Sequence, residues 1–70
     1  MYGRIDMVKL TKKELQILQL IAEGKQSSQI AEELCLSLPT IKWYRKRLRD
    51  KFETGTTVGM VRKAINEGLI

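Results

Sequence analysis

The stretch from Thr40 to Lys51 reads Thr-Ile-Lys-Trp-Tyr-Arg-Lys-Arg-Leu-Arg-Asp-Lys, and the rest of the chain is organised around it. Apolar residues recur at helical spacing through this stretch and just beyond it, at Ile41, Tyr44, Leu48 and Phe52. The spacing predicts a helix that buries one stripe of side chains. At about 100° per residue, polar side chains then gather on the opposite side of the helix.

The positive charge of the chain is concentrated in the same stretch. The chain has 13 Lys and Arg residues and 8 Asp and Glu residues, a formal net charge of +5. Residues 42–51 hold six of these basic residues and one acid, so the remaining seven basic and seven acidic residues cancel. A basic run is often only a solvated helix face, but here a tryptophan shares that face and no interleaved acids are expected to form i, i+4 pairs. Double-stranded DNA is therefore the favoured partner.

Size and composition limit what the chain can be. A chain of 70 residues forms one domain with a small core. Cys35 is the single cysteine, interpreted as a partly buried apolar filler, and histidine is absent, so no metal site and no cofactor are expected. Residues 1–9 have neither a signal-peptide pattern nor a membrane-length apolar run, and we interpret them as a leader or linker remnant before a domain at 10–70. The sequence predicts a soluble cytoplasmic protein with no membrane partner.

Helix signals along the chain predict an all-α fold of four helices without strands. N-cap residues are expected at Thr11, Ser37 and Thr56, and Glu14 completes a capping box with Thr11. The predicted helices cover residues 11–23, 27–34, 38–52 and 57–67. They are expected to cross around an apolar set, namely Leu18, Ile21, Ile30, Leu34, Ile41, Leu48 and Val61.

The short helix at 27–34, a tight turn and the longer basic helix at 38–52 follow the helix-turn-helix plan, whose second helix enters the DNA major groove. Base contacts are expected from the side facing away from the apolar stripe, at Lys42, Trp43 and Lys46. Phosphate contacts are expected from the other cations and from hydroxyls near two helix starts, at Arg45, Arg47, Arg49, Lys51, Ser27, Ser28 and Thr40. Any single cation could instead be only solvated, and Trp43 could lie in the core or bind a protein.

The last helix, at 57–67, carries more apolar residues than one core stripe needs. Val58, Val61 and Ile65 are expected to face the core, with Met60 and Ala64 widening the stripe into an apolar edge. This edge is either part of the monomer's own core or a homodimer interface.

Residues spread along the chain also match the sequence pattern of a known protein family, without insertions or deletions. They are Leu10-Thr11, Glu14, Ile17-Leu18, Leu20-Ile21-Ala22, Gly24, Ile30-Ala31, Leu34, Ser37, Thr40-Ile41-Lys42, Lys51 and Gly68-Leu69-Ile70. Over roughly residues 9–70 the chain resembles the LuxR-type (GerE-like) DNA-binding domain, commonly the C-terminal effector of response regulators and quorum-sensing receptors. The resemblance implies base contacts at Lys42, Trp43 and Lys46, phosphate contacts at Thr40 and Lys51, and a homodimer formed through the fourth helix.

Some positions depart from the pattern of that family. Ser28-Gln29 replaces a frequent Lys-Glu, Tyr44 replaces a common histidine, and Glu53-Thr54 replaces the usual Gly-Val after the third helix. Gly59 replaces a frequent acid and is expected to weaken the fourth helix.

Together these features favour a sequence-specific transcriptional regulator that binds duplex DNA, with RNA polymerase as a further candidate partner. One alternative is a promoter-recognition module like the C-terminal region of sigma factors. Another is a helical protein-interaction module anchored by Trp43 and Met60. An enzyme is disfavoured because the eight acids are scattered and neither histidine nor a Gly-rich phosphate loop is present.

Overall fold

Four helices make up the computed structural model, which describes residues 8–70: α1 (Lys12–Ala22), α2 (Ser27–Leu34), α3 (Leu38–Lys51) and α4 (Thr57–Asn66). No strand occurs between residues 8 and 70, so the all-α prediction is confirmed, and each helix end lies within one residue of its predicted position. Residues 1–7 of the predicted leader lie outside the described residues. Val8 already packs against the core, and its amide donates to the Glu67 carboxylate over 3.4 Å.

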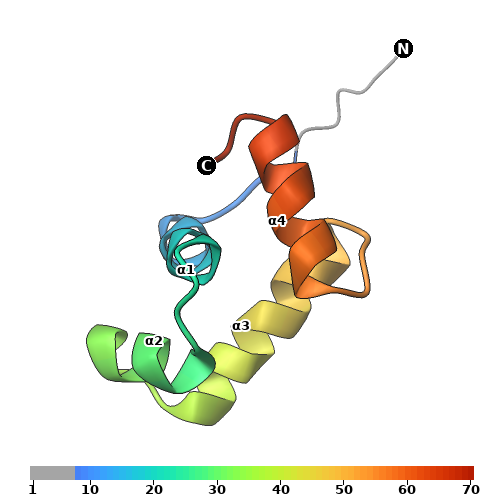
Figure 1. Ribbon diagram of the computed structural model, residues 1–70. Helices are drawn as coiled ribbons and strands as arrows, with labels where there is room; N and C mark the ends of the chain where they lie inside the picture. The colour runs from blue at the N-terminus through green and yellow to red at the C-terminus, as the bar shows by residue number, and fades with distance from the viewer. Residues whose placement is uncertain (1–7) are drawn as a thin grey trace.

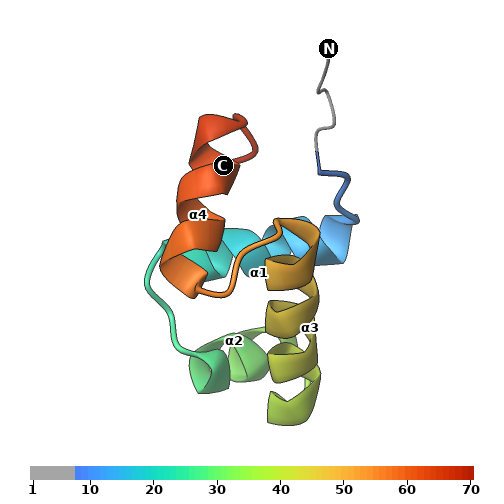
Figure 2. The same ribbon diagram turned by 90° about the vertical axis from the view of Figure 1, so that its right-hand side faces the viewer.

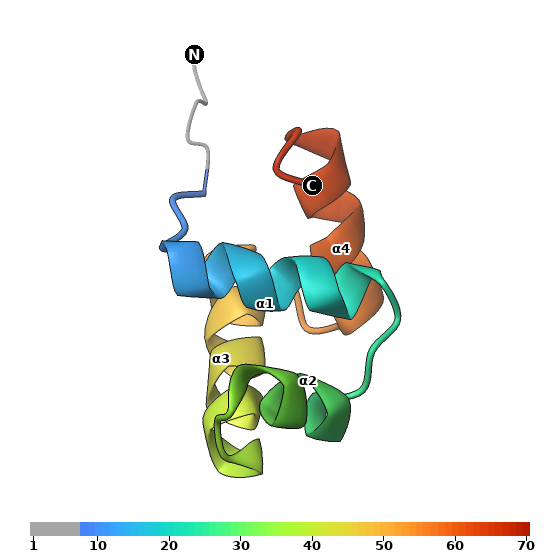
Figure 3. The ribbon, with the colours of Figure 1, turned by 90° about the vertical axis from the view of Figure 1, so that its left-hand side faces the viewer.

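α3 is the central element of the fold. Like α1, it contacts each of the other three helices, whereas α2 and α4 do not contact one another within the described part of the chain. α1 and α2 cross α3 at two levels (Figures 2 and 3), and α4 lies at the opposite end of the molecule from α2 (Figure 1). One side of α3 is therefore packed along its whole length.

The core joins all four helices. Its buried apolar members are Ile17, Leu18, Leu20, Ile21, Ile30, Ala31, Ile41, Leu48, Phe52, Met60 and Ala64. Leu34 and Val61, which were predicted to belong to this set, are only partly buried against it, as is Tyr44. Full burial of each large apolar side chain contributes about 1.5–3 kcal/mol to the free energy of unfolding. The short α2 depends on this packing, because an isolated helix of its length is unstable in water.

The predicted helix caps are confirmed. Thr11 Oγ1 accepts from the Glu14 amide over 3.1 Å, and Glu14 Oε1 accepts from the Thr11 amide over 2.9 Å, which completes the capping box. The Ser37 and Thr56 hydroxyls accept from amides three residues later, over 3.2 and 3.0 Å. These caps satisfy backbone donors that have no partner within the first turn of a helix.

The predicted orientation of α4 is wrong. Met60 and Ala64, predicted to form an apolar edge that is either core or dimer interface, are fully buried in the core, while Val58 and Ile65, expected in the core, are 71% and 57% exposed. The two apolar groups lie side by side on one short helix, so spacing alone does not say which of them faces the core. Packing against α1 and α3 selects Met60 and Ala64.

The interpretation of Cys35 as a partly buried filler is also wrong. Cys35 is exposed and has a left-handed backbone conformation, with φ 57°. It follows the last residue of α2, where such a conformation commonly ends a helix. The Leu36 amide then donates to the Ala31 carbonyl over 2.9 Å, and Leu36 packs against the core, which sets the tight turn into α3.

Candidate nucleic-acid interface

The side of α3 that faces away from the core carries exposed Lys42, Trp43, Lys46 and Asp50, and we call it the outer face of α3. It lies opposite Ile41 and Leu48, both fully buried, as helical spacing requires. The three residues predicted to contact bases are thus brought together on one exposed surface. Trp43 is 56% exposed, so the alternative that it belongs to the core is wrong.

Neighbouring side chains hold Trp43 on two sides. Its ring meets the Tyr44 ring edge to face, with centroids 5.0 Å apart, and the guanidinium carbon of Arg47 lies 5.4 Å from its ring centroid. Trp43 also lines two open hollows of the surface. One, of about 480 Å³, is shared with Lys46, Arg47, Asp50 and Lys51; the other, of about 350 Å³, is shared with Pro39, Thr40 and Tyr44.

Lys46 has an acidic partner on the outer face that the sequence analysis did not expect. Its ammonium lies 3.1 Å from Asp50 Oδ2, an i, i+4 pair between two exposed side chains. Such pairs contribute about 0.3–0.5 kcal/mol at most, so Lys46 can leave Asp50 at little cost to contact another group. Within residues 8–70, the Lys42 side chain has no hydrogen-bond or ion-pair partner.

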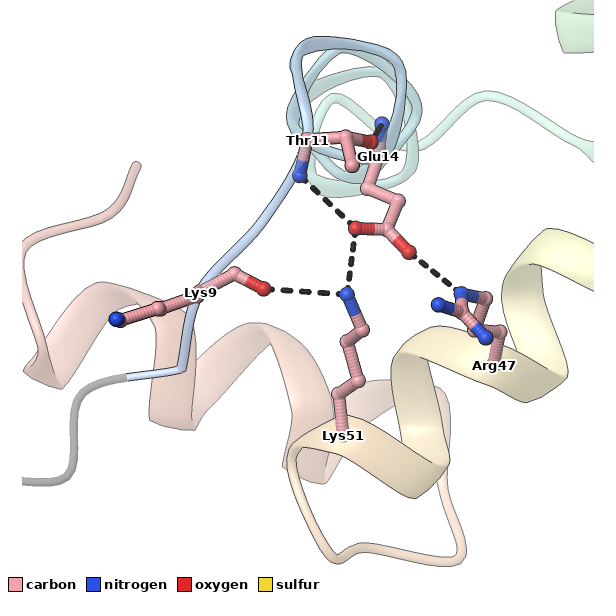
Figure 4. A network of polar contacts seen from close by, with 5 residues as sticks. All are labelled: Lys9, Thr11, Glu14, Arg47 and Lys51. Carbon is pink, nitrogen blue, oxygen red and sulfur yellow. Dashed lines mark hydrogen bonds and ion pairs between the residues drawn. The ribbon is translucent and has the colours of Figure 1, made fainter.

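A buried carboxylate anchors one flank of α3 (Figure 4). Glu14 of α1 is 1% exposed; its Oε2 accepts from Arg47 Nε over 2.8 Å and its Oε1 from Lys51 Nζ over 2.7 Å. Lys51 Nζ also donates to the Lys9 carbonyl over 3.1 Å. Burial alone would raise the pKa of Glu14, but the hydrogen bonds from Lys51, the Thr11 amide and Arg47 outweigh it and lower the pKa to about 2.

The Glu14 network changes the expected roles of two cations. Arg47 and Lys51, predicted to contact phosphate, already bind a carboxylate within the protein. From the sequence, Glu14 was expected only to complete the capping box of α1. Its two cationic partners are 33 and 37 residues away, so no local pattern could have indicated them.

The other flank of α3 faces the start of α4. Half-buried Arg45 donates from Nη2 to Thr57 Oγ1 over 3.1 Å. Burial, and secondarily the charge of nearby Arg49, lower the pKa of Arg45. Neither Arg45 nor Arg49 has an acidic partner among residues 8–70, and both lie beside the outer face.

The three hydroxyl residues predicted to contact phosphate lie in the first turns of two helices. Ser27 and Ser28 begin α2, the first half-buried and the second exposed. The Thr40 hydroxyl lies 2.8 Å from the Ser37 hydroxyl in the first turn of α3. Amides at such helix starts favour an anion.

The part of the chain that the structure describes has neither a metal site nor a membrane-spanning helix. No three His, Cys, Asp or Glu side chains of residues 8–70 gather closely enough to hold a metal ion. None of the four helices is long and apolar enough to cross a membrane.

Comparison with known proteins gives one family. The model of the family described as "Bacterial regulatory proteins, luxR family" matches residues 8–64. The transcriptional regulatory protein MctR of Rhizobium johnstonii is 38% identical over 61 residues, which are 87% of this chain and 28% of MctR. The response regulator UvrY of Escherichia coli is 37% identical over 60 residues, 86% of this chain and 28% of UvrY. The chain thus spans less than a third of the length of either relative.

Solved structures show the same arrangement of helices. A Vibrio cholerae VqmA structure described as a complex with ligand and DNA superimposes with a TM-score of 0.84 at 28% identity, over 99% of this chain and 30% of VqmA. A second structure, described as a VqmA dimer in the absence of target DNA, gives a TM-score of 0.86 at 31% identity, over 96% of this chain and 31% of VqmA.

Proposed function

The chain belongs to the LuxR family of bacterial regulatory proteins, a family of DNA-binding transcription regulators, and we propose that it binds duplex DNA through the outer face of α3. α3 is the second helix of the helix-turn-helix and would lie in the major groove. The observation that carries this proposal is the exposure of Lys42, Trp43 and Lys46 together on the one helix that holds the net positive charge.

These three side chains have different means of reading a base pair. Lys42 and Lys46 lie one turn apart, and each can donate to guanine O6 or N7. Trp43 presents an exposed ring that can pack on a thymine methyl group or on a sugar. Lys42 has no competing partner in residues 8–70, whereas Lys46 exchanges Asp50 for the base.

Phosphate contacts would come from the flanks of α3 and from the starts of α2 and α3. Arg45 and Arg49 are the favoured cations because neither has an acidic partner among the described residues. Hydroxyls and first-turn amides near Ser27, Ser28 and Thr40 would hold further phosphate oxygens. Arg47 and Lys51 would contribute less, since each must share its charge with Glu14.

We further propose that the chain pairs with a second copy of itself on DNA through α4. The exposed apolar residues Val58 and Ile65 line, with Val61, Arg62 and Asn66, an open hollow of about 330 Å³. An exposed apolar surface of this kind on a small domain suits a protein partner. The described VqmA dimer supports a second copy as that partner. A contact with RNA polymerase is a separate proposal, and copurification with the polymerase core enzyme would test it.

The experiment that tests DNA binding is a titration with duplex DNA at several salt concentrations, using fragments selected by the protein from genomic DNA. About five to seven phosphate contacts predict a slope of log affinity against log salt of roughly −4 to −6. Arg49→Ala should reduce the magnitude of this slope by about 0.9 and weaken binding to all sequences alike. Binding that does not depend on salt would exclude the proposed interface.

A further inference from the structure

Arg47 makes two contacts that belong to different parts of the domain. Its Nε donates to the buried Glu14 carboxylate of α1, while its guanidinium carbon lies 5.4 Å from the Trp43 ring centroid on the outer face. Figure 4 shows Arg47 reaching from α3 toward Glu14 on α1, next to Lys51. The side chain thus connects a fixed point in the protein interior to the most exposed aromatic ring of the described residues.

The Glu14 end of this connection is rigid. Glu14 Oε1 accepts from both the Thr11 amide and Lys51, which leaves Oε2 directed at Arg47. The pKa of Glu14, lowered to about 2 by these donors, keeps the carboxylate ionised at every pH at which duplex DNA would be studied. Since a guanidinium is planar, a fixed Nε also limits the orientation of its flat face.

The Trp43 end of the connection is confined as well. A cation within about 6 Å of an indole centroid is attracted to the ring, and the edge of Tyr44 limits the ring from another side. An exposed tryptophan without such neighbours would sample several rotamers. A ring that is already ordered loses less conformational freedom when it packs against DNA.

We propose that Arg47, anchored by Glu14, is a positioning residue that holds the Trp43 ring ready for base contact, and that it is not a phosphate contact. This inference rests on the proposed base contact of Trp43. It replaces the phosphate role that the charge of Arg47 suggested. It also explains why a cation on the DNA-binding helix is tied to a carboxylate in the interior, an arrangement that a phosphate contact would not need.

The first test needs no DNA, because Trp43 is the only tryptophan of the chain and its fluorescence reports on this ring alone. Arg47→Lys keeps the positive charge beside Glu14 but removes the planar group, and Arg47→Ala removes both. Time-resolved anisotropy should show faster local motion of the ring in both variants. Arg49→Ala, which removes a cation from the same helix but not from the Trp43 ring, should leave this motion unchanged. Wild-type ring motion in the Arg47 variants would overturn the proposal.

The second test measures affinity for selected DNA. Arg47→Lys should weaken specific binding roughly two- to fivefold, the change that corresponds to an exposed cation–π contact of about 0.5–1 kcal/mol, with non-specific binding unchanged. In a Trp43→Ala background the same substitution should have no further effect. Wild-type affinity of Arg47→Lys, or an effect that adds fully to that of Trp43→Ala, would overturn the positioning role. Failure of Trp43→Ala itself to weaken specific binding would instead overturn the base contact of Trp43.

Discussion

Glu14 shows how one side chain can serve both a helix and the whole domain. Its carboxylate caps α1 through the Thr11 amide and also binds Arg47 and Lys51 of α3. The capping role could be predicted because Thr11 and Glu14 are three residues apart. The cationic partners could not, since they depend on the angle at which α1 crosses α3.

The first prediction concerns the pH dependence of stability at Glu14. The pKa of this carboxyl is about 2 in the folded protein against an ordinary 4.5. Because the folded-state pKa is the lower one, the stabilisation is complete above about pH 4.5 and is lost as the pH falls toward 2. The difference of about 2.5 pKa units corresponds to roughly 3 kcal/mol of unfolding free energy.

Urea unfolding of the wild type and of Glu14→Gln between pH 6 and pH 2.5 would measure this effect. Glutamine cannot ionise, so the wild type should be more stable at pH 6 and the difference between the two proteins should shrink steadily below pH 4.5. A difference that stays constant with pH would show that the ionised carboxylate does not stabilise the fold.

At the scale of elements, two departures from the family pattern lie near the junction of α3 and α4: Glu53 in the connecting segment and Gly59 in the first turn of α4. Glu53, at the position of the usual glycine, has a left-handed backbone conformation with φ 54°. A Cβ added at Gly59 would lie only 2.5 Å from Thr54 Oγ1 and 2.9 Å from Thr56 Oγ1. The weakening of α4 expected from Gly59 stays a prediction, but a side chain at this position would displace the two threonine hydroxyls.

The second prediction follows from the backbone at Glu53. Glu53→Gly should raise the unfolding free energy by about 1 kcal/mol, because glycine adopts positive φ without the clash that a Cβ causes. Glu53→Ala is the matched control: it removes the same carboxylate but keeps the Cβ, so it should have little effect. Thermal melting of the two variants would measure the difference in stability. Equal stabilisation by both would show that the gain comes from removal of the charge and not from relief of backbone strain.

The caps at Thr11, Ser37 and Thr56 and the bounds of all four helices could be predicted, because each depends on residues within three or four positions of one another. The rotation of α4 about its own axis could not. Val58 and Ile65 form one apolar group and Met60 and Ala64 an adjacent one, and both have helical spacing. Only the packing of α4 against α1 and α3 distinguishes them.

At the scale of the whole molecule, the rotation of α4 moves the proposed dimer contact to a new surface. Ile65→Glu should abolish cooperative occupancy of a DNA probe with two half-sites about one helical turn apart, while sparing a probe with one half-site. Met60→Glu should instead unfold the domain, because Met60 is fully buried. Gel-shift titrations with the two probes would measure the effect of Ile65→Glu, and equal weakening on both probes would exclude α4 as the pairing surface.

The sequence predicted the outer face of the candidate DNA-binding surface but not the contacts on its flanks. The exposure of Lys42, Trp43 and Lys46 followed from helical spacing, since the buried stripe of α3 is unambiguous. The flanks depended on neighbours distant in sequence: Arg45 bonds to Thr57, while Arg47 and Lys51 bond to Glu14. A charge count treats these cations alike, and only the tertiary contacts separate the free ones from those already paired.

The claim that the outer face of α3 binds DNA is tested most directly by nuclear magnetic resonance of the isotopically labelled chain during titration with a selected duplex. The largest shifts should occur at the amides of Lys42 and Lys46 and at the indole N–H of Trp43, with smaller shifts in the first turn of α2. Shifts concentrated instead on Val58 and Ile65 of α4, with α3 unchanged, would contradict the proposed interface.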